Sequence, residues 1–171
     1  SWIYGHAIAT LALTELLVMT GDELHLRQPV EDAVKLCLQA QNQGFGWRYG
    51  VKPGENDTSI TGWMVLALKT AMNARLSIPR EDIQSALGGA LNWIQRATAS
   101  NGRTGYQAPG DEGSRMAGVF AEPYPFSKEM SAMTAVGVLC RLLGGERRES
   151  SALRNGVDIL LRELPRWGEQ R

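Results

Sequence analysis

The chain of 171 residues lacks an excess of charge of either sign, because 18 lysine and arginine residues balance 18 aspartate and glutamate residues. This balance gives no electrostatic reason to expect a nucleic acid or an anionic membrane surface as a partner. The sequence also contains no basic stripe with interleaved aromatic residues. We therefore expect no nucleic-acid binding.

Cysteine is also scarce, with Cys37 and Cys140 each inside a helical apolar pattern. Two such residues neither form a disulfide framework nor indicate a compartment, and their positions favour buried thiols that pack as small hydrophobic side chains. No apolar run reaches the roughly 20 residues that a bilayer-spanning helix needs. Strand signals are nearly missing, since period-two alternation is rare and no Asn-Gly hairpin joins β-branched runs.

Helical periodicity, by contrast, recurs six times. We predict helices over about residues 4–19, 29–42, 59–72, 77–99, 127–143 and 147–164. Gly21 is suited to ending the first helix, Pro29 to the first turn of the second, and Asp57 or Thr58 to capping the third. The pair Gly88-Gly89 lowers helix propensity in the fourth, which predicts a close helix–helix approach there.

The six segments form three similar pairs. The first member of each pair carries little charge, as in ATLALTEL, WMVLALKT and AVGVLCRL, whereas its partner carries more. This asymmetry predicts a buried inner layer and a more polar outer layer. Helical hairpins that repeat at intervals of 55 to 71 residues are typical of a solenoid or a closed toroid. We predict a single all-α domain over residues 1–171.

The first long loop resembles a known family. Its sequence, QNQGFGWRYG, is similar to the glutamine-tryptophan repeat of squalene–hopene and oxidosqualene cyclases, with Gln41 as the glutamine and Trp47 as the aromatic residue. Phe45 stands where that family often has a glycine. The repeat implies a structural staple, because the amide can bond backbone groups at a helix end and the indole can pack across the next hairpin. The second loop, TASNGRTGYQAPG, keeps a glycine and Tyr106.

The resemblance extends over nearly the whole chain. The stretches YGHAIATLAL, GWRYGVKPGENDTSITGWMVLAL and TAVGVLCRLLGG are similar to bacterial proteins with prenyltransferase or squalene-cyclase repeats, related to protein prenyltransferase β-subunits. The implied fold is a partial α/α-toroid of three helical hairpins. A complete toroid of this kind has about twice as many helices, and no initiator methionine is present. We therefore expect the chain to be a fragment of a longer toroid.

The chemistry of these families requires motifs that this chain does not contain. Class II cyclases use an Asp-x-Asp-Asp acid, and the acidic doublets here (Glu31-Asp32, Glu81-Asp82 and Asp111-Glu112) fit solvated or helix-start positions. Prenyltransferases hold zinc through aspartate, cysteine and histidine, whereas His6, His25, Cys37 and Cys140 are scattered. The thioester element of complement-like toroids is also missing. We predict no catalytic residue, no metal and no cofactor.

Contact residues are predicted in two places. Asp57 and Glu129 both begin inner helices and could share one mouth of the ring. The aromatic side chains of Tyr4, Trp47 and Trp63 could stabilise a carbocation in an isoprenoid-handling enzyme, or they could pack in the core. The long loop over residues 100–126 could be a recognition surface. The predicted cavity or mouth contacts are Tyr4, His6, Trp47, Arg48, Asp57, Trp63 and Glu129, and the predicted loop contacts are Arg103, Tyr106, Arg115 and Tyr124.

Two functions follow from these observations. The first is a non-catalytic binding or scaffold module with a terpene cyclase-like or prenyltransferase-like fold, binding an apolar or isoprenoid ligand or a protein partner. The alternative is an isoprenoid-handling enzyme, a terpene cyclase or prenyltransferase, whose catalytic motif lies outside this chain. Because open ends of a helical repeat expose apolar surface, we also expect self-association or packing against the missing half of the ring.

Overall fold

The computed structural model describes residues 2–109, 111, 131–162 and 164. Within these residues the protein is all-helical, as predicted, with six helices and no β-strand. The helices are α1 (Trp2–Thr20), α2 (Glu23–Ala40), α3 (Thr58–Ala71), α4 (Arg80–Arg96), α5 (Ala132–Leu143) and α6 (Ser151–Arg162).

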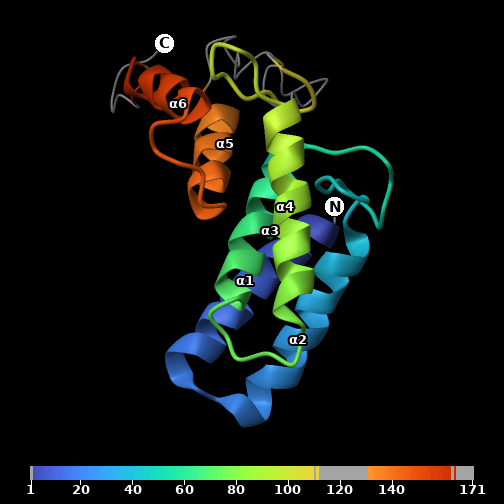
Figure 1. The fold of residues 1–171 in the computed structure, drawn as a ribbon. Coiled ribbons are helices and arrows are strands. Elements are labelled where there is room, and N and C mark those ends of the chain that lie inside the picture. Colours follow the sequence, from blue (N-terminus) through green and yellow to red (C-terminus); the bar gives the residue numbers. More distant parts are fainter. Residues whose placement is uncertain (1, 110, 112–130, 163, 165–171) are drawn as a thin grey trace, which may run out of the picture.

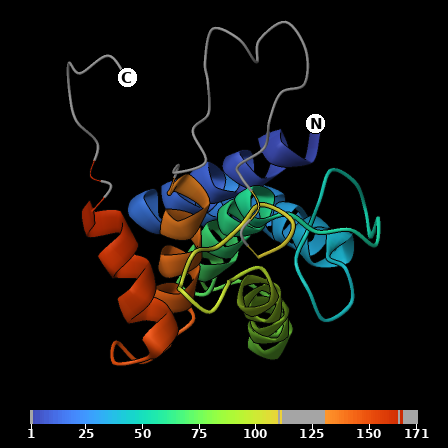
Figure 2. The ribbon, with the colours of Figure 1, turned by 90° about the horizontal axis from the view of Figure 1, so that it is seen from above.

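The helices are arranged as successive antiparallel hairpins (Figure 1). The odd-numbered helices run in one direction and form a row in which α1 contacts α3 and α3 contacts α5. The even-numbered helices run the other way; α2 packs on α1, α3 and α4, whereas α6 packs on α5. Seen from above, α3 lies at the centre, and α1 and α5 lie on different sides of it (Figure 2).

The core is built from apolar side chains at helical spacing. On α3, Ile60, Met64 and Leu68 are fully buried, and on α2 the same holds for Val30 and Val34. Residues three and four apart lie on the same face of a helix, so each set forms one buried stripe. Their burial accounts for the helical periodicity of the sequence.

Helix α2 differs from its predicted bounds, because it begins at Glu23 and not near Pro29. The carboxylate of Asp22 caps its first turn by accepting a hydrogen bond of 3.1 Å from the backbone N–H of His25. Glu23 also forms an ion pair with Arg27 one turn further on. Pro29 therefore lies inside the helix, where it removes one helical hydrogen bond. The cap and the continuing apolar stripe outweigh that loss.

The prediction for the paired glycines of α4 is also corrected. A Cβ atom at Gly89 would lie 2.8 Å from Nε2 of Gln41 and 2.9 Å from the carbonyl oxygen of Phe45, whereas one at Gly88 would meet open space. The close neighbour is thus the loop that follows α2, and only the second glycine is required. Asp57, in contrast, caps α3 as predicted, with Oδ1 accepting a hydrogen bond of 2.9 Å from the N–H of Ile60.

Helix α1 is apolar on nearly all its sides. By length and composition it could cross a membrane, which corrects the expectation that no apolar run is long enough. A core helix of a soluble protein has the same properties, and α1 packs against α2 and α3 with Ile3, Ala7 and Leu17 buried. The opposite face of α1, which includes Leu16 and Met19, is exposed.

Candidate functional site

Two loops meet at the end of the molecule where α1 and α3 begin. Residues 41–57 connect α2 to α3, and residues 97–109 follow α4. The second loop lies on the first turn of α3, because Thr58 donates from its N–H to the carbonyl of Tyr106 at 2.9 Å and from Oγ1 to the carbonyl of Gly105 at 2.7 Å. This double contact brings side chains of both loops close to the start of α3.

The first loop is held by Gln41 and Trp47. The amide of Gln41 donates to the carbonyl of Phe45 at 2.6 Å and to that of Ala86 in α4 at 2.7 Å. The indole of Trp47 is fully buried, and its Nε1 donates to the carbonyl of Cys37 in the last turn of α2 at 2.7 Å. The indole, and not the glutamine amide, therefore bonds the end of the helix, while the glutamine links the loop to the next hairpin.

The second loop repeats one element of this arrangement. The N–H of Trp47 donates to Oγ1 of Thr61 in α3 at 3.2 Å, and the N–H of Thr104 donates to Oγ1 of Thr134 in α5 at 3.2 Å. Thr104 in the second loop thus corresponds to Trp47 in the first. Tyr106 follows Thr104 by two residues, as Tyr49 follows Trp47, and the hydroxyl groups of these two tyrosines meet.

Three tyrosines converge above the start of α3, and we call Tyr4, Tyr49 and Tyr106 the tyrosine cluster. The rings of Tyr4 and Tyr49 are stacked with their centres 6.2 Å apart. The hydroxyl groups of Tyr49 and Tyr106 are hydrogen-bonded to each other, and that of Tyr4 is bonded to Ser59. Sequence reasoning missed Tyr49 and Ser59; the only available signal was the position of Tyr49 two residues after Trp47.

Asp57 lies beneath the cluster and is fully buried. Its Oδ1 accepts hydrogen bonds from the N–H of Ile60 and, at 3.1 Å, from the hydroxyl of Ser59, whereas its Oδ2 has no hydrogen-bond partner. Burial raises the pKa of the Asp57 carboxyl group, and these hydrogen bonds oppose the rise. The nearby Tyr106 hydroxyl also lowers the pKa of Asp57, although Oδ2 has no hydrogen-bond partner of normal geometry.

The cluster is neutral, with one cation at its rim. Burial raises the pKa of Tyr4 and, more strongly, that of Tyr106, so both hydroxyl groups stay protonated at neutral pH. Arg48 forms an ion pair with Glu55, and its guanidinium carbon lies 5.6 Å from the centre of the Tyr49 ring. The arrangement offers hydroxyl groups, an aromatic face and a guanidinium, but no activated nucleophile.

An apolar seam between α1 and α3 continues from the cluster. One helical turn beyond Tyr4 and Ser59 lie Ile8 and Trp63, which are 43% and 36% exposed. Leu11, about one turn further along α1, is half-buried. Because the two helices run in the same direction (Figure 1), these side chains extend the surface away from the tyrosines. We call Ile8, Leu11 and Trp63 the α1–α3 seam.

Comparison of this chain with protein-family models, curated proteins and solved structures finds no match. The resemblance to terpene cyclases and prenyltransferases therefore stays a prediction.

The remaining predicted contacts lie apart from the cluster or outside the described residues. His6 is half-buried between α1 and α2, with Nε2 2.9 Å from the carbonyl oxygen of Ala33. Arg103 lies in the turn after α4, where its N–H donates to Oδ1 of Asn101 at 3.0 Å. Three predicted contacts fall outside the described residues: Arg115, Tyr124 and Glu129.

Neither a metal site nor a reactive thiol is found in the described part of the chain. No group of three or more histidine, cysteine, aspartate or glutamate residues there could hold a metal ion. Both cysteines are buried, and burial raises the pKa of Cys37 to about 11 and that of Cys140 to about 12. Since the thiolate is the nucleophile, both side chains are inert at neutral pH.

This burial predicts that the folded protein resists thiol reagents. At pH 8 we expect less than about a tenth of the Cys37 and Cys140 thiols to react with 5,5′-dithiobis(2-nitrobenzoic acid) in the time that fully labels a denatured sample, because the thiolate form is scarce and covered. Absorbance at 412 nm measures the reaction. Labelling of the native protein as fast as that of the urea-unfolded control would contradict the buried positions of the thiols.

Proposed function

We propose that this chain is a non-catalytic binding module, built as part of an α/α-toroid, that holds an apolar ligand with a polar end group. The apolar part of the ligand would lie along the α1–α3 seam, and its polar end would meet the tyrosine cluster. An isoprenoid alcohol has this chemistry. The convergence of three tyrosines from α1 and both loops is the observation that carries the proposal.

The cluster suits such a ligand for physical reasons. Stacked aromatic rings provide rigid apolar area, and neutral phenol groups both donate and accept hydrogen bonds. A hydroxyl group at the end of the ligand could donate a hydrogen bond to Tyr49 or Tyr106 or accept one from them, and no charge would need to be buried. Arg48 at the rim adds a guanidinium donor. Tyr4, His6 and Glu15 are the ionisable residues of α1, and the exposed Glu15 lies one turn beyond Leu11, where the apolar part of the seam ends.

The toroid part of the proposal is supported by the alternation of the helices. The low-charge helices α1, α3 and α5 form a continuous row, and the more polar helices pack behind it. A partial toroid requires this order of inner and outer helices. The segment from Gln41 to Trp47 supports the kinship with cyclase repeats, because it staples one hairpin to the next.

An enzyme is the second candidate, and Asp57 is the observation that favours it. A buried carboxyl group with a raised pKa could act as a general acid. However, Oδ1 caps α3 and the side chain has no exposed surface. A substrate could reach Asp57 only if the cap opened. We therefore prefer the binding function.

Titration with farnesol tests the proposal. Farnesol should bind the full chain and quench tryptophan fluorescence, since Trp63 lies in the seam. Replacing Tyr49 by alanine should weaken binding about 3- to 10-fold, as expected for the loss of an aromatic contact. Val51→Ala is the matched control, because Val51 is an exposed residue of the same loop. Absence of farnesol binding, or equal affinity of the Tyr49→Ala variant, would reject the binding proposal.

The same samples separate the two candidate functions. Incubation with farnesyl diphosphate or squalene, followed by mass spectrometry of the extract, should return the unchanged compounds. Formation of a cyclised or transferred product that is lost in an Asp57→Asn variant would establish the enzyme instead.

A further inference from the structure

Helix α1 carries an uncovered apolar face at one edge of the row of odd-numbered helices. Its exposed side chains include Leu16 at 45% and Met19 at 83%. We call the following set the α1 edge: Trp2, Gly5, Ala9, Ala12, Leu16 and Met19, all exposed and none of them charged. A helix that is apolar on all sides is normally covered on all sides.

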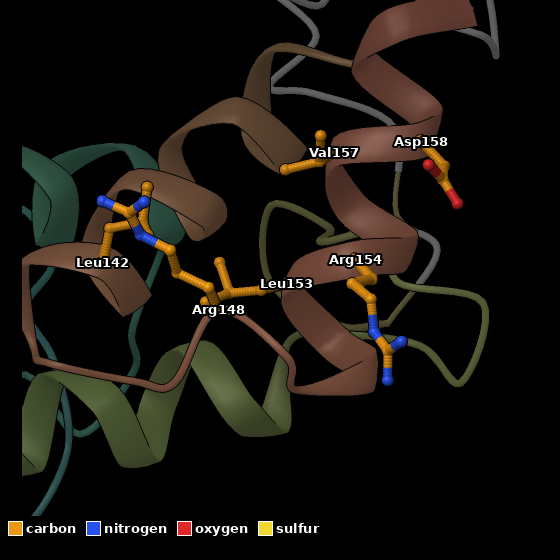
Figure 3. Close-up of a pocket in the computed structure, with 6 residues that line it drawn as sticks. All are labelled: Leu142, Arg148, Leu153, Arg154, Val157 and Asp158. Carbon is orange, nitrogen blue, oxygen red and sulfur yellow. The ribbon is translucent and has the colours of Figure 1, made fainter.

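A second uncovered apolar face lies at the other end of the row. On α5, Leu139 and Leu142 are 41% and 46% exposed, and on α6 Leu161 is 61% exposed. We call Ala135, Leu139, Leu142, Val157 and Leu161 the α5–α6 edge. A groove of about 270 Å³ between the two helices is lined by Leu142, Leu153 and Val157, with Arg148, Arg154 and Asp158 around it (Figure 3).

The repeat geometry indicates what could cover both edges. Successive odd-numbered helices run in the same direction and pack side by side, as α1 does with α3 and α3 with α5. Helices α1 and α5 do not contact each other. An α5 helix from another copy of this chain, placed against α1, would continue the same side-by-side relationship. Terminal repeats that remain single usually carry a polar outer face, whereas Glu15 is the only charged side chain on the exposed face of α1.

The charges of the two end hairpins are also complementary. Residues 2–40 hold five acidic and two basic side chains: Glu15, Asp22, Glu23, Glu31 and Asp32 against Arg27 and Lys35. Residues 131–162 hold five basic and three acidic ones: Arg141, Arg147, Arg148, Arg154 and Arg162 against Glu146, Glu149 and Asp158. Glu31 is buried, and Arg141 is buried in its pair with Glu146. The other charges still leave the first hairpin acidic and the last one basic, so head-to-tail contact places an acidic hairpin beside a basic one, whereas contact between two like edges would place like charges together.

We propose that copies of this chain associate head to tail, with the α1 edge of one copy packed against the α5–α6 edge of the next. Such an interface is heterologous, so it leaves one edge of each kind free and continues into a ring or a filament. This inference does not depend on the bound ligand, because it uses the exposed side chains of the α1 edge and not the tyrosine cluster; the edge adjoins the seam, since Ala12 lies one helical turn beyond Ile8.

Sedimentation velocity of the full chain at about 1–200 µM tests the proposal. The wild type should show a mass that rises with concentration. Leu16→Glu on the α1 edge and Leu139→Glu on the α5–α6 edge should each leave a monomer over this range, because each variant buries a charge at one side of every interface. Ser85→Glu, at an exposed position of α4, is the matched control and should associate as the wild type does. Circular dichroism checks that each variant is folded.

Mixing the two edge variants is the decisive measurement. The Leu16→Glu chain keeps an intact α5–α6 edge and the Leu139→Glu chain an intact α1 edge, so an equimolar mixture should form a 1:1 dimer and nothing larger. Two results would overturn the proposal: a wild type that stays monomeric, or a Leu139→Glu variant that still self-associates through α1. If the monomeric wild type then bound phosphatidylcholine vesicles through Leu16 and Met19, a lipid surface would be the occupant.

Discussion

Replacing Trp47 by alanine is expected to lower the free energy of unfolding by about 3–5 kcal/mol. The Trp47 indole is fully buried, and its Nε1 supplies a hydrogen bond to the carbonyl of Cys37. The substitution removes a large apolar volume and also this bond to the end of α2. Urea unfolding followed by circular dichroism measures the change, with the slope of the transition checked for constancy.

Two further variants separate the parts of this effect. Trp47→Phe keeps most of the apolar volume and removes the Nε1 donor, so we expect a loss of about 1–3 kcal/mol. Trp63→Ala removes an indole that is 36% exposed and should cost less than Trp47→Ala. If Trp47→Ala proved no more destabilising than Trp63→Ala, Trp47 would not be the staple that we describe.

The second large effect is expected at Arg141, a buried cation that joins the last two hairpins. Its Nη1 donates to Oε1 of Gln95 in α4 at 3.0 Å and to Oε2 of Glu146 at 2.7 Å, and its side chain is 5% exposed. Glu146 in turn accepts a hydrogen bond from Ser150, just before α6. Replacing Arg141 by alanine should lower the free energy of unfolding by about 3–5 kcal/mol, because Glu146 loses its partner.

The pH dependence offers a second readout of the same contact. Burial disfavours the ionised form of Glu146, but its bonds to Ser150 and Arg141 outweigh burial and hold the pKa of Glu146 below its usual range. The stability from this pair is thus complete above the unfolded pKa, about 4.3, and is lost as the pH falls through the lower folded pKa. Between pH 5 and 3 the wild type should therefore lose more stability than the Arg141→Ala variant.

Two substitutions show whether charge or packing accounts for the result. Arg141→Met keeps the aliphatic volume and removes the charge, so it should be less destabilising than alanine. Arg147→Ala removes an arginine side chain that is 89% exposed and should change the free energy of unfolding by less than about 0.5 kcal/mol. A loss at Arg141 as small as that at Arg147 would show that the buried pair contributes little.

Some local features of the molecule could be predicted from neighbouring residues alone. The third helix was expected to start at Asp57 or Thr58, and Asp57 caps it, because an aspartate before an apolar period is a strong N-terminal signal. The predicted start of α2 was wrong, because the sequence around a proline does not show whether it lies in the first turn of a helix or further inside it. Only the cap at Asp22 and the buried stripe of α2 distinguish the two.

The tyrosine cluster could not be predicted as a unit. Tyr4, Tyr49 and Tyr106 are separated by 45 and 57 residues, and no spacing rule connects a helix residue with two loop residues. Their meeting depends on Thr58, which fixes the second loop to the start of α3. Gly89 is a similar case, because its backbone conformation is ordinary and only the neighbouring loop requires a glycine there.

The helical class of the chain, the positions of most helices and the low charge of three of them could be predicted from the sequence, because periodicity, caps and breakers act over a few residues. Only the folded molecule shows which side chains meet at the loops, that Arg141 is buried with Glu146, and which faces of α1, α5 and α6 are exposed. Those outcomes depend on contacts between residues far apart in the chain, and local energetics does not encode such contacts.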